Sequence, residues 1–205
     1  MTPGLRVAIA DDERDMRDFL QEALTDLGHQ VVVVAGTGAE LVQGCSRQPV
    51  DLIITDIKMP DLDGIEAARQ IGREGPVPVI LVSAYHDAEL IRRAEEEHIL
   101  AYLVKPIKTA DLEPAIAIAM RRFHQFQELR RQAANLAQAL ADRKIIERAK
   151  GILMKAAALD EAAAFRRLQK LASDNNKKLV EVAHMIVLTE EATRPEKPRT
   201  ERNRE

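Results

Sequence analysis

Apolar and polar positions along the first part of the chain form two kinds of segment. Short runs rich in β-branched residues occupy five places, at 5–10, 30–35, 50–55, 77–82 and 100–104. Stretches with helical spacing lie between them; one covers 19–27, with Gly28 where a helix C-cap is expected. The runs 31–34 and 79–82 are apolar on consecutive residues, which is typical of strands buried on both faces. Five strands alternating with helices predict an α/β fold with a doubly wound, five-stranded parallel sheet.

From about residue 111 the strand-like runs stop and helical spacing takes over. Apolar residues at spacings of three and four form a short seam, namely Phe126, Leu129, Ala133, Leu136 and Leu140. These are the a and d positions of a coiled coil. The seam covers barely two heptads, so it predicts either a helix that dimerises or one that packs within its own chain.

Three helices are expected after the seam, at about 141–157, 160–172 and 179–188, with Asp160 as the N-cap of the second. Their apolar positions, Phe165 among them, predict a small all-α three-helix core. Residues 193–205 are charged, contain two prolines and lack apolar side chains, which predicts a disordered tail. The expected division is 1–122 for the α/β domain, 123–140 for a helical linker, 141–192 for the three-helix domain and 193–205 for the tail.

The composition excludes several classes of protein. Of 205 residues 46% are hydrophobic, which is enough for a buried core. The single cysteine, Cys45, allows neither an intramolecular disulfide nor a thiolate zinc site. No run approaches the ~20 apolar residues of a membrane span, and the N-terminus lacks the apolar stretch of a secretory signal. We therefore expect a cytoplasmic protein with no membrane contact.

The net charge of −3 hides two halves of opposite sign. Residues 1–120 hold 11 Lys+Arg against 21 Asp+Glu, a net charge of −10, and residues 121–205 hold 19 against 12, a net charge of +7. This split favours two modules with different partners, one of them a polyanion. Chance variation in solvated faces explains it equally well.

Five polar side chains stand where predicted strands end. Asp11 and Asp12 follow the first strand, Asp56 the third, Ser83 the fourth and Lys105 the fifth. In a sheet of this class, ligands bind beyond the carboxyl ends of the strands, so these side chains are expected to converge. Each one alone has a plain structural reading, such as a helix cap or a solvated lysine, but the conjunction favours a site. Three carboxylates with a lysine and a hydroxyl suit Mg²⁺ and an aspartyl phosphate.

The sequence strings around these residues resemble the receiver domains of two-component response regulators. They are Ala-Asp-Asp-Glu at 10–13, Thr-Asp-Ile-Lys-Met-Pro at 55–60, Asp-Gly at 63–64, Ser-Ala at 83–84 and Lys-Pro at 105–106. The resemblance covers roughly residues 4–122 and implies a flavodoxin-like fold.

The resemblance also implies a role for each site residue. Asp56 would be the phospho-acceptor, and Asp11, Asp12, Asp56 and the backbone carbonyl of Lys58 would hold Mg²⁺. Lys105 and Ser83 would contact the phosphoryl group, and the Lys105–Pro106 peptide bond would be cis. Ser83 and Tyr102 would form the switch pair that changes the surface around the fifth strand and its two neighbouring helices.

The basic half carries a second family pattern. Basic residues gather on the three expected helices. Two specific sequence strings stand at 140–154 (Leu-Ala-Asp-Arg-Lys-Ile-Ile-Glu-Arg-Ala-Lys-Gly-Ile-Leu-Met) and at 163–168 (Ala-Ala-Phe-Arg-Arg-Leu). Together with 179–183, these strings resemble the ANTAR domain, which follows a receiver in the AmiR/NasT regulators. The family pattern departs at 156–160, where a glycine commonly found in the first turn is missing. Candidate RNA contacts are Arg143, Arg148, Lys150 and Arg167.

The two resemblances imply a phosphorylation-controlled RNA-binding protein. A sensor histidine kinase would phosphorylate Asp56, and the helical domain would bind hairpins of nascent mRNA and prevent transcription termination. Enzymatic activity would be limited to self-phosphorylation and slow self-dephosphorylation. A homodimer through the linker and the helical domain is possible. Two alternatives remain, a DNA-binding transcription factor and a signalling adaptor that uses the helices for protein contacts.

Overall fold

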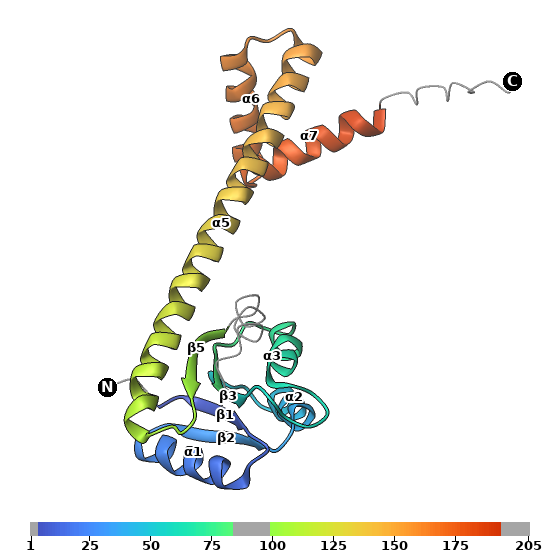
Figure 1. Ribbon diagram of the computed structural model, residues 1–205. Coiled ribbons are helices and arrows are strands. Elements are labelled where there is room, and N and C mark those ends of the chain that lie inside the picture. Colours follow the sequence, from blue (N-terminus) through green and yellow to red (C-terminus); the bar gives the residue numbers. More distant parts are fainter. Residues whose placement is uncertain (1–3, 84–98, 194–205) are drawn as a thin grey trace, which may run out of the picture. The chain divides into compact units, whose positions relative to one another are not determined.

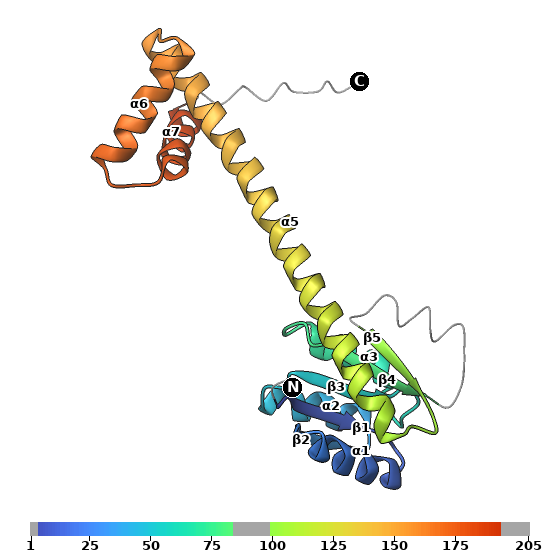
Figure 2. The same ribbon diagram turned by 90° about the vertical axis from the view of Figure 1, so that its left-hand side faces the viewer.

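The computed structural model describes residues 4–83 and 99–193 (Figures 1 and 2). Its elements in chain order are β1 (Arg6–Ala10), α1 (Arg14–Asp26), β2 (Gln30–Ala35), α2 (Gly38–Arg47), β3 (Leu52–Asp56), α3 (Gly64–Gly72), β4 (Val79–Ser83), β5 (Ile99–Val104), α5 (Thr109–Ala157), α6 (Glu161–Asp174) and α7 (Leu179–Thr193). The chain divides into two compact units, 1–129 and 130–205. Each unit is described by itself below. The helix expected between β4 and β5, and the tail from residue 194 onward, lie outside the described residues.

The first unit is built on a five-stranded sheet with the order β2-β1-β3-β4-β5, and every neighbouring pair is parallel. The predicted doubly wound parallel sheet is therefore confirmed. The strand order reverses at β1, which lies between β2 and β3. That switch point is where sheets of this class bind ligands.

Helices cover both faces of this sheet. On one face, side chains of α1 and of the first turns of α5 pack against β1, β3 and β4, with Leu24, Leu112 and Ile116 fully buried. On the other face, α2 and α3 bury Leu41 and Ile65 against alternate residues of the same strands. Figure 1 shows α1 and α2 on opposite sides of the sheet. Because successive residues of a strand point to opposite faces, β1, β3 and β4 are apolar almost without interruption.

The prediction that 31–34 is buried on both faces was wrong, whereas the same prediction for 79–82 is confirmed. All four residues of 79–82 are buried in β4, but Val34 of β2 is 48% exposed and Val31 and Val32 are half-buried. The reason is position in the sheet. β2 is an edge strand, which has a neighbour on one side only.

The helix that begins at Thr109 runs without interruption to Ala157 (Figure 2). The predicted linker 123–140 and the predicted first helix of the small domain are therefore one helix, and the predicted limits at 122 and 140 both fall inside it. Pro114 is the sixth residue of this helix, beyond the first turn, so its ring nitrogen cannot donate the helical hydrogen bond to the carbonyl of Ala110. The third helix of the small domain is longer than predicted and ends at Thr193.

The second unit has the predicted three-helix core, formed by the last part of α5 with α6 and α7. Six side chains are buried in it, namely Ala149, Leu168, Ala172, Val182, Ala183 and Val187. Asp160 is the N-cap of α6, as predicted, and its carboxylate accepts a hydrogen bond from the N–H of Ala163. Phe165 was predicted to be part of this core, and the structure corrects that prediction. Its side chain is 36% exposed because it lies between the buried face of α6 and solvent.

Candidate functional site

Three carboxylates meet at the carboxyl ends of β1 and β3. One oxygen from each of Asp11, Asp12 and Asp56 lies within 4.8 Å of the others. Asp11 is fully buried and Asp56 is 8% exposed, whereas Asp12 faces solvent. The parallel pairing of β1 with β3, with Ala10 opposite Thr55, places Asp11, which follows β1, beside Asp56, the last residue of β3.

Lys105 completes this cluster from the end of β5. Its Nζ lies 2.9 Å from Asp11 Oδ2, 2.9 Å from Asp56 Oδ2 and 3.1 Å from Glu13 Oε1. Its side chain is 12% exposed. The Lys105–Pro106 peptide bond is cis, as predicted. The acidic cluster is defined below as Asp11, Asp12, Asp56 and Lys105.

The charges of the acidic cluster influence one another in opposite directions. Burial raises the pKa of Asp11 above its ordinary value, against the ammonium of Lys105 and the N–H of Glu13, which act to lower it. Burial also acts to lower the pKa of Lys105, but the carboxylates of Asp11, Asp56 and Glu13 raise it above its ordinary value. The two directions are compatible because Lys105 is attracted by several carboxylates, whereas Asp11 has a single lysine and is also repelled by Asp56.

Two residues without a predicted role support the acidic cluster. Glu13, quoted above as part of the acidic string, reaches Lys105 and also donates its backbone N–H to Asp11 Oδ1 at 2.9 Å. Arg17 donates through Nη1 to the carbonyl oxygens of Asp11 and Asp12, at 2.7 and 3.1 Å. Arg17 thereby holds the backbone of the aspartate pair in place. Arg17 lies near the start of α1, and the sequence carries no signal that it would reach back to these carbonyls.

The Asp63–Gly64 pair positions Asp56 from the next helix. Asp63 is the N-cap of α3, with its carboxylate accepting from the N–H of Glu66 at 2.8 Å. A Cβ at Gly64 would lie 2.0 Å from the carbonyl oxygen of Asp56 and 2.8 Å from Thr55 Oγ1. Glycine is therefore required at 64, because the first residue of α3 packs directly against the backbone of Asp56.

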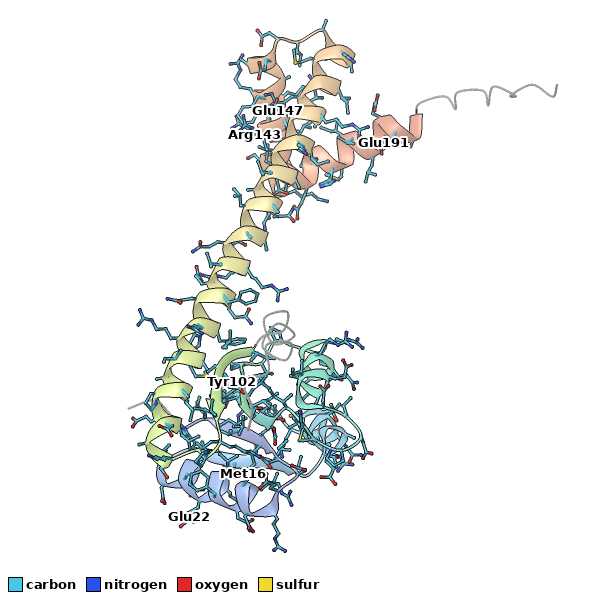
Figure 3. The ribbon with its side chains drawn as sticks, in the orientation of Figure 1. Met16, Glu22, Tyr102, Arg143, Glu147 and Glu191 are labelled. Atoms are coloured by element: carbon cyan, nitrogen blue, oxygen red, sulfur yellow. The ribbon has the colours of Figure 1, made fainter. Side chains whose placement is uncertain are left out.

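The remaining predicted site residues lie at the end of β4, within β5 and just after β3. Ser83 is the last residue of β4 and is 3% exposed, and its carbonyl accepts the N–H of Lys105 at 2.9 Å. Tyr102 pairs with Leu81 in the β4–β5 ladder and packs half-buried on the face covered by α2 and α3 (Figure 3). The backbone N–H of Lys58 donates to Asp56 Oδ1 at 3.3 Å, which brings Lys58 to the acidic cluster.

The donor set of the acidic cluster suits a hard divalent cation. All the candidate ligands are oxygen atoms, and Mg²⁺ binds through one or two carboxylates while keeping waters and accepting substrate phosphate oxygens. Asp11 Oδ2 is fully buried, and among the described residues no group donates a well-directed hydrogen bond to it, although Lys105 lies at ion-pair distance. A buried carboxylate oxygen of this kind is suited to a metal ion. The residues present therefore fit Mg²⁺.

The four predicted RNA contacts in the second unit differ in their surroundings. Arg143 and Arg167 are exposed, on α5 and α6. Arg148 is 45% exposed at its side chain and pairs with Glu191 at 2.6 Å (Figure 3 labels Arg143 on α5 and Glu191 on α7). Lys150 is 7% exposed, with its Nζ 2.7 Å from Glu161 Oε1 and 3.0 Å from both carboxylate oxygens of Glu147. The hydrogen bonds that Lys150 donates to Glu161 and Glu147 raise the pKa of Lys150.

Comparisons with known proteins agree with this two-part organisation. Residues 7–117 match the response regulator receiver domain family, and residues 134–187 match the ANTAR domain family. The transcriptional regulatory protein PdtaR of Mycobacterium tuberculosis is 38% identical over 184 residues, which cover 90% of both chains. The receiver domain of the putative response regulator NarL from the same species is a structural neighbour, with a TM-score of 0.55 and 25% identity over 58% of this chain and 98% of its own. A CheX–CheY–BeF₃–Mg²⁺ complex from Borrelia burgdorferi has a TM-score of 0.53 and 25% identity over 56% and 87%.

The parallel sheet and its acidic edge are those of a receiver domain. The chain belongs to the response regulators in which a receiver domain is followed by an ANTAR domain, and PdtaR is similar to it along most of its length. This architecture is typical of regulators that are not enzymes. Within 4–83 and 99–193, the described helices include none that is both long and apolar enough to cross a membrane.

Proposed function

We propose that this response regulator is phosphorylated on Asp56 by a partner histidine kinase, and that phosphorylation controls its binding to hairpins of nascent mRNA and so prevents transcription termination. The observation that supports phosphorylation of Asp56 is the convergence of Asp11, Asp12 and Asp56 within 4.8 Å, with Lys105 at 2.9 Å from Asp56. The observation that supports RNA binding is the basic second unit, which matches the ANTAR domain family.

The phosphoryl transfer follows from the position of Asp56. A carboxylate oxygen of Asp56 forms a bond to phosphorus while the bond from phosphorus to the kinase histidine nitrogen breaks, and that nitrogen keeps the electron pair. Asp11, Asp12, Asp56 and the carbonyl of Lys58 would hold Mg²⁺, which shields the nucleophile from the incoming negative charge. The name of the Borrelia burgdorferi complex, with BeF₃ and Mg²⁺ beside a CheY chain, supports this proposal.

Ser83 and Lys105 are proposed to contact the phosphoryl group, and Ser83 and Tyr102 to form the switch. Ser83 is buried at the end of β4, and its hydroxyl can donate to a phosphoryl oxygen. Tyr102 is half-buried on β5 and joins an apolar ring to a polar hydroxyl, so it is suited to two positions. A phosphoryl group adds nearly two negative charges to the acidic cluster, which supplies the energy for such a change.

Arg143, Arg148 and Arg167 remain proposed RNA contacts, but Lys150 is withdrawn. A buried ammonium already paired with two carboxylates cannot reach a phosphate without first breaking those pairs. Exposed lysines and arginines carry a smaller cost because their charges are already solvated, and of the three arginines Arg148 would have to give up its pair with Glu191 to contact a phosphate. Other exposed basic residues of the second unit extend the proposed surface: Lys144, Lys155, Arg166, Lys170, Lys177 and Lys178.

A homodimer through the seam of α5 is part of the proposal. The seam is Phe126, Leu129, Ala133, Leu136 and Leu140, and its four large side chains are 40%, 64%, 64% and 54% exposed in the order of the chain. Exposed leucines at a and d spacing are typical of helices that pair.

Two experiments on the full-length chain test the proposal. Incubation with acetyl phosphate and Mg²⁺ should give an acid-stable, hydroxylamine-sensitive phosphoprotein from the wild type and none from Asp56→Asn. Acyl phosphate that persists in Asp56→Asn would reject Asp56 as the acceptor. A filter-binding competition between hairpin RNA and duplex DNA at fixed salt should favour the RNA. Preference for the duplex would favour a DNA-binding regulator, and no salt-dependent affinity for either would favour a protein adaptor.

A further inference from the structure

Phe165 is an exposed aromatic ring in a domain that is almost devoid of them. It is the only Phe, Tyr or Trp in residues 130–205. Its neighbours Ala164 and Leu168 are fully buried, whereas the Phe165 side chain is 36% exposed and contributes to no hydrophobic cluster found among the described residues. A single exposed apolar side chain is common in proteins and has no meaning alone. The groups around this ring are what distinguish it.

A buried cation lies against the ring. Lys150 Nζ is 5.9 Å from the centroid of Phe165, within the range of a cation–π contact. That ammonium has little freedom, because Glu147 on α5 and Glu161 on α6 hold it at 3.0 and 2.7 Å. The pair between Lys150 on α5 and Glu161 in the first turn of α6 ties the two helices together, and Phe165 lies one turn after Glu161. Part of the ring therefore faces solvent while a restrained cation lies within cation–π distance of it.

The residues that follow the ring are exposed and basic. Arg166 and Arg167 come directly after Phe165, and Lys170 lies about one turn further along α6. A partly exposed aromatic ring on a helix that also carries exposed basic side chains offers the chemistry that binds unpaired nucleotides. The bases stack on the ring, and the cations neutralise the phosphates.

We propose that Phe165 stacks on an unpaired base of an RNA loop, and that Lys150 is the positioning residue that holds its ring for this contact. The inference rests on the proposed RNA-binding function and deepens it, since it specifies a looped-out base rather than the paired stem as the group that Phe165 recognises. It also gives Lys150 a role that its buried ion pairs allow. Lys150 acts through Phe165 and not on the phosphate backbone.

The test begins with the full-length chain and a pool of hairpin RNAs with randomised loops. The wild-type chain selects a hairpin from this pool, and that hairpin is the probe for every variant. Phe165→Leu keeps an apolar side chain but removes the aromatic face, and Phe165→Tyr keeps the face. We expect Phe165→Leu to weaken binding by roughly tenfold or more, which is the scale of one stacked base. Phe165→Tyr should bind as the wild type does.

Three further measurements separate stacking from a structural role. The salt dependence of binding should be the same for Phe165→Leu as for the wild type, because no phosphate contact is removed, whereas Arg167→Gln should reduce the slope by about one. Leu188→Ala removes a 61% exposed side chain from α7 and should leave binding unchanged. Lys150→Met should weaken binding in the wild type but cause little further loss in Phe165→Leu, because the two residues act as a unit.

Each other result has a definite meaning. If the wild type selects no hairpin, the proposed RNA-binding function fails and this inference fails with it. If the wild type binds and Phe165→Leu binds equally well, the stacking inference alone is overturned. It is also overturned if Phe165→Leu lowers the unfolding temperature in step with affinity, or changes the oligomeric state instead of affinity, since the ring would then serve packing or a protein interface. An equal loss from Lys150→Met in both backgrounds would remove the positioning role.

Discussion

The Lys105 ammonium lies 2.9 Å from Asp56 Oδ2, although 49 residues separate the two in the chain. The same ammonium lies 2.9 Å from Asp11 Oδ2 and so links the ends of β1, β3 and β5. Its positive charge lies against both carboxylates and offsets their mutual repulsion. The acidic cluster therefore has a structural consequence that can be measured apart from phosphorylation.

Replacing Lys105 with methionine should destabilise the receiver domain at neutral pH. The pKa of Lys105 is raised in the folded state, so its contribution to stability is fully present below the unfolded value of about 10.4 and is lost only as the pH rises through the folded value. Urea unfolding at pH 7 should therefore show a lower midpoint for Lys105→Met. Mg²⁺ should restore part of the loss, because it supplies positive charge to the same carboxylates. Lys108→Met, at an exposed position, is the matched control, and an unchanged midpoint for Lys105→Met would contradict this account.

Replacing Asp11 with asparagine should have the opposite effect on stability. Burial raises the pKa of Asp11, so the side chain contributes stability below its unfolded pKa of about 4, and that contribution is lost as the pH rises through the folded value. Once that contribution is lost the buried carboxylate no longer favours folding, and at pH 7 Asp11→Asn should unfold at a higher urea concentration than the wild type. The gain should shrink as the pH is lowered toward 4. The variant should also lose stabilisation by Mg²⁺.

Asp15→Asn provides the comparison for Asp11→Asn. It removes an exposed carboxylate from the first turn of α1, where negative charge is favourable, so it should give no gain in stability. A gain of equal size in both variants would mean that the effect comes from net charge and not from the buried position.

A methyl group at Gly64 should disturb both stability and phosphorylation. The added Cβ would meet the carbonyl oxygen of Asp56 at 2.0 Å, which forces α3 and the end of β3 apart. Overpacking of this kind costs about 1–3 kcal/mol. Gly72→Ala is the matched control, since it lies in the same helix with nothing within 4 Å, and it should be neutral or slightly stabilising. Equal rates of labelling by acetyl phosphate in Gly64→Ala and the wild type would show that the backbone of Asp56 tolerates the shift.

A lysine at Leu136 should weaken self-association. Leu136 is 64% exposed at the centre of the seam on α5, and burying a leucine stabilises by about 1.5–3 kcal/mol. Leu136→Lys should therefore raise the dissociation constant of the dimer at least ~10-fold, as measured by sedimentation equilibrium. Asn135→Lys adds the same charge to an exposed position beside the seam and should have a smaller effect. A wild-type chain that is monomeric at every concentration tested would reject the dimer.

Much of the fold was predictable from the sequence because its signals are local. Periodicity alone located all five strands and the helical half, and Asp160 was recognised as a cap from its place before an apolar helix. The acidic residues at 11, 12 and 56 were recognised because parallel strands bring their carboxyl ends to one edge, whatever the details of packing. Predicting that those three residues and Lys105 form one site required no tertiary information beyond the fold class.

What the tertiary structure alone decided were exposure and pairing. An apolar run does not reveal whether its strand lies at an edge, so the exposure of Val34 followed only from the sheet order. Basic and aromatic residues on a helix do not reveal which of them meet a carboxylate from another helix. From the sequence we therefore predicted Lys150 as a phosphate contact and Phe165 as a core residue. Only the packing of α5 against α6 revealed the ion pair between Lys150 and Glu161 and the exposure of Phe165. The sequence determined which side chains carry the chemistry, and packing decided which of them face a ligand, because burial is a property of neighbours that are distant in the chain.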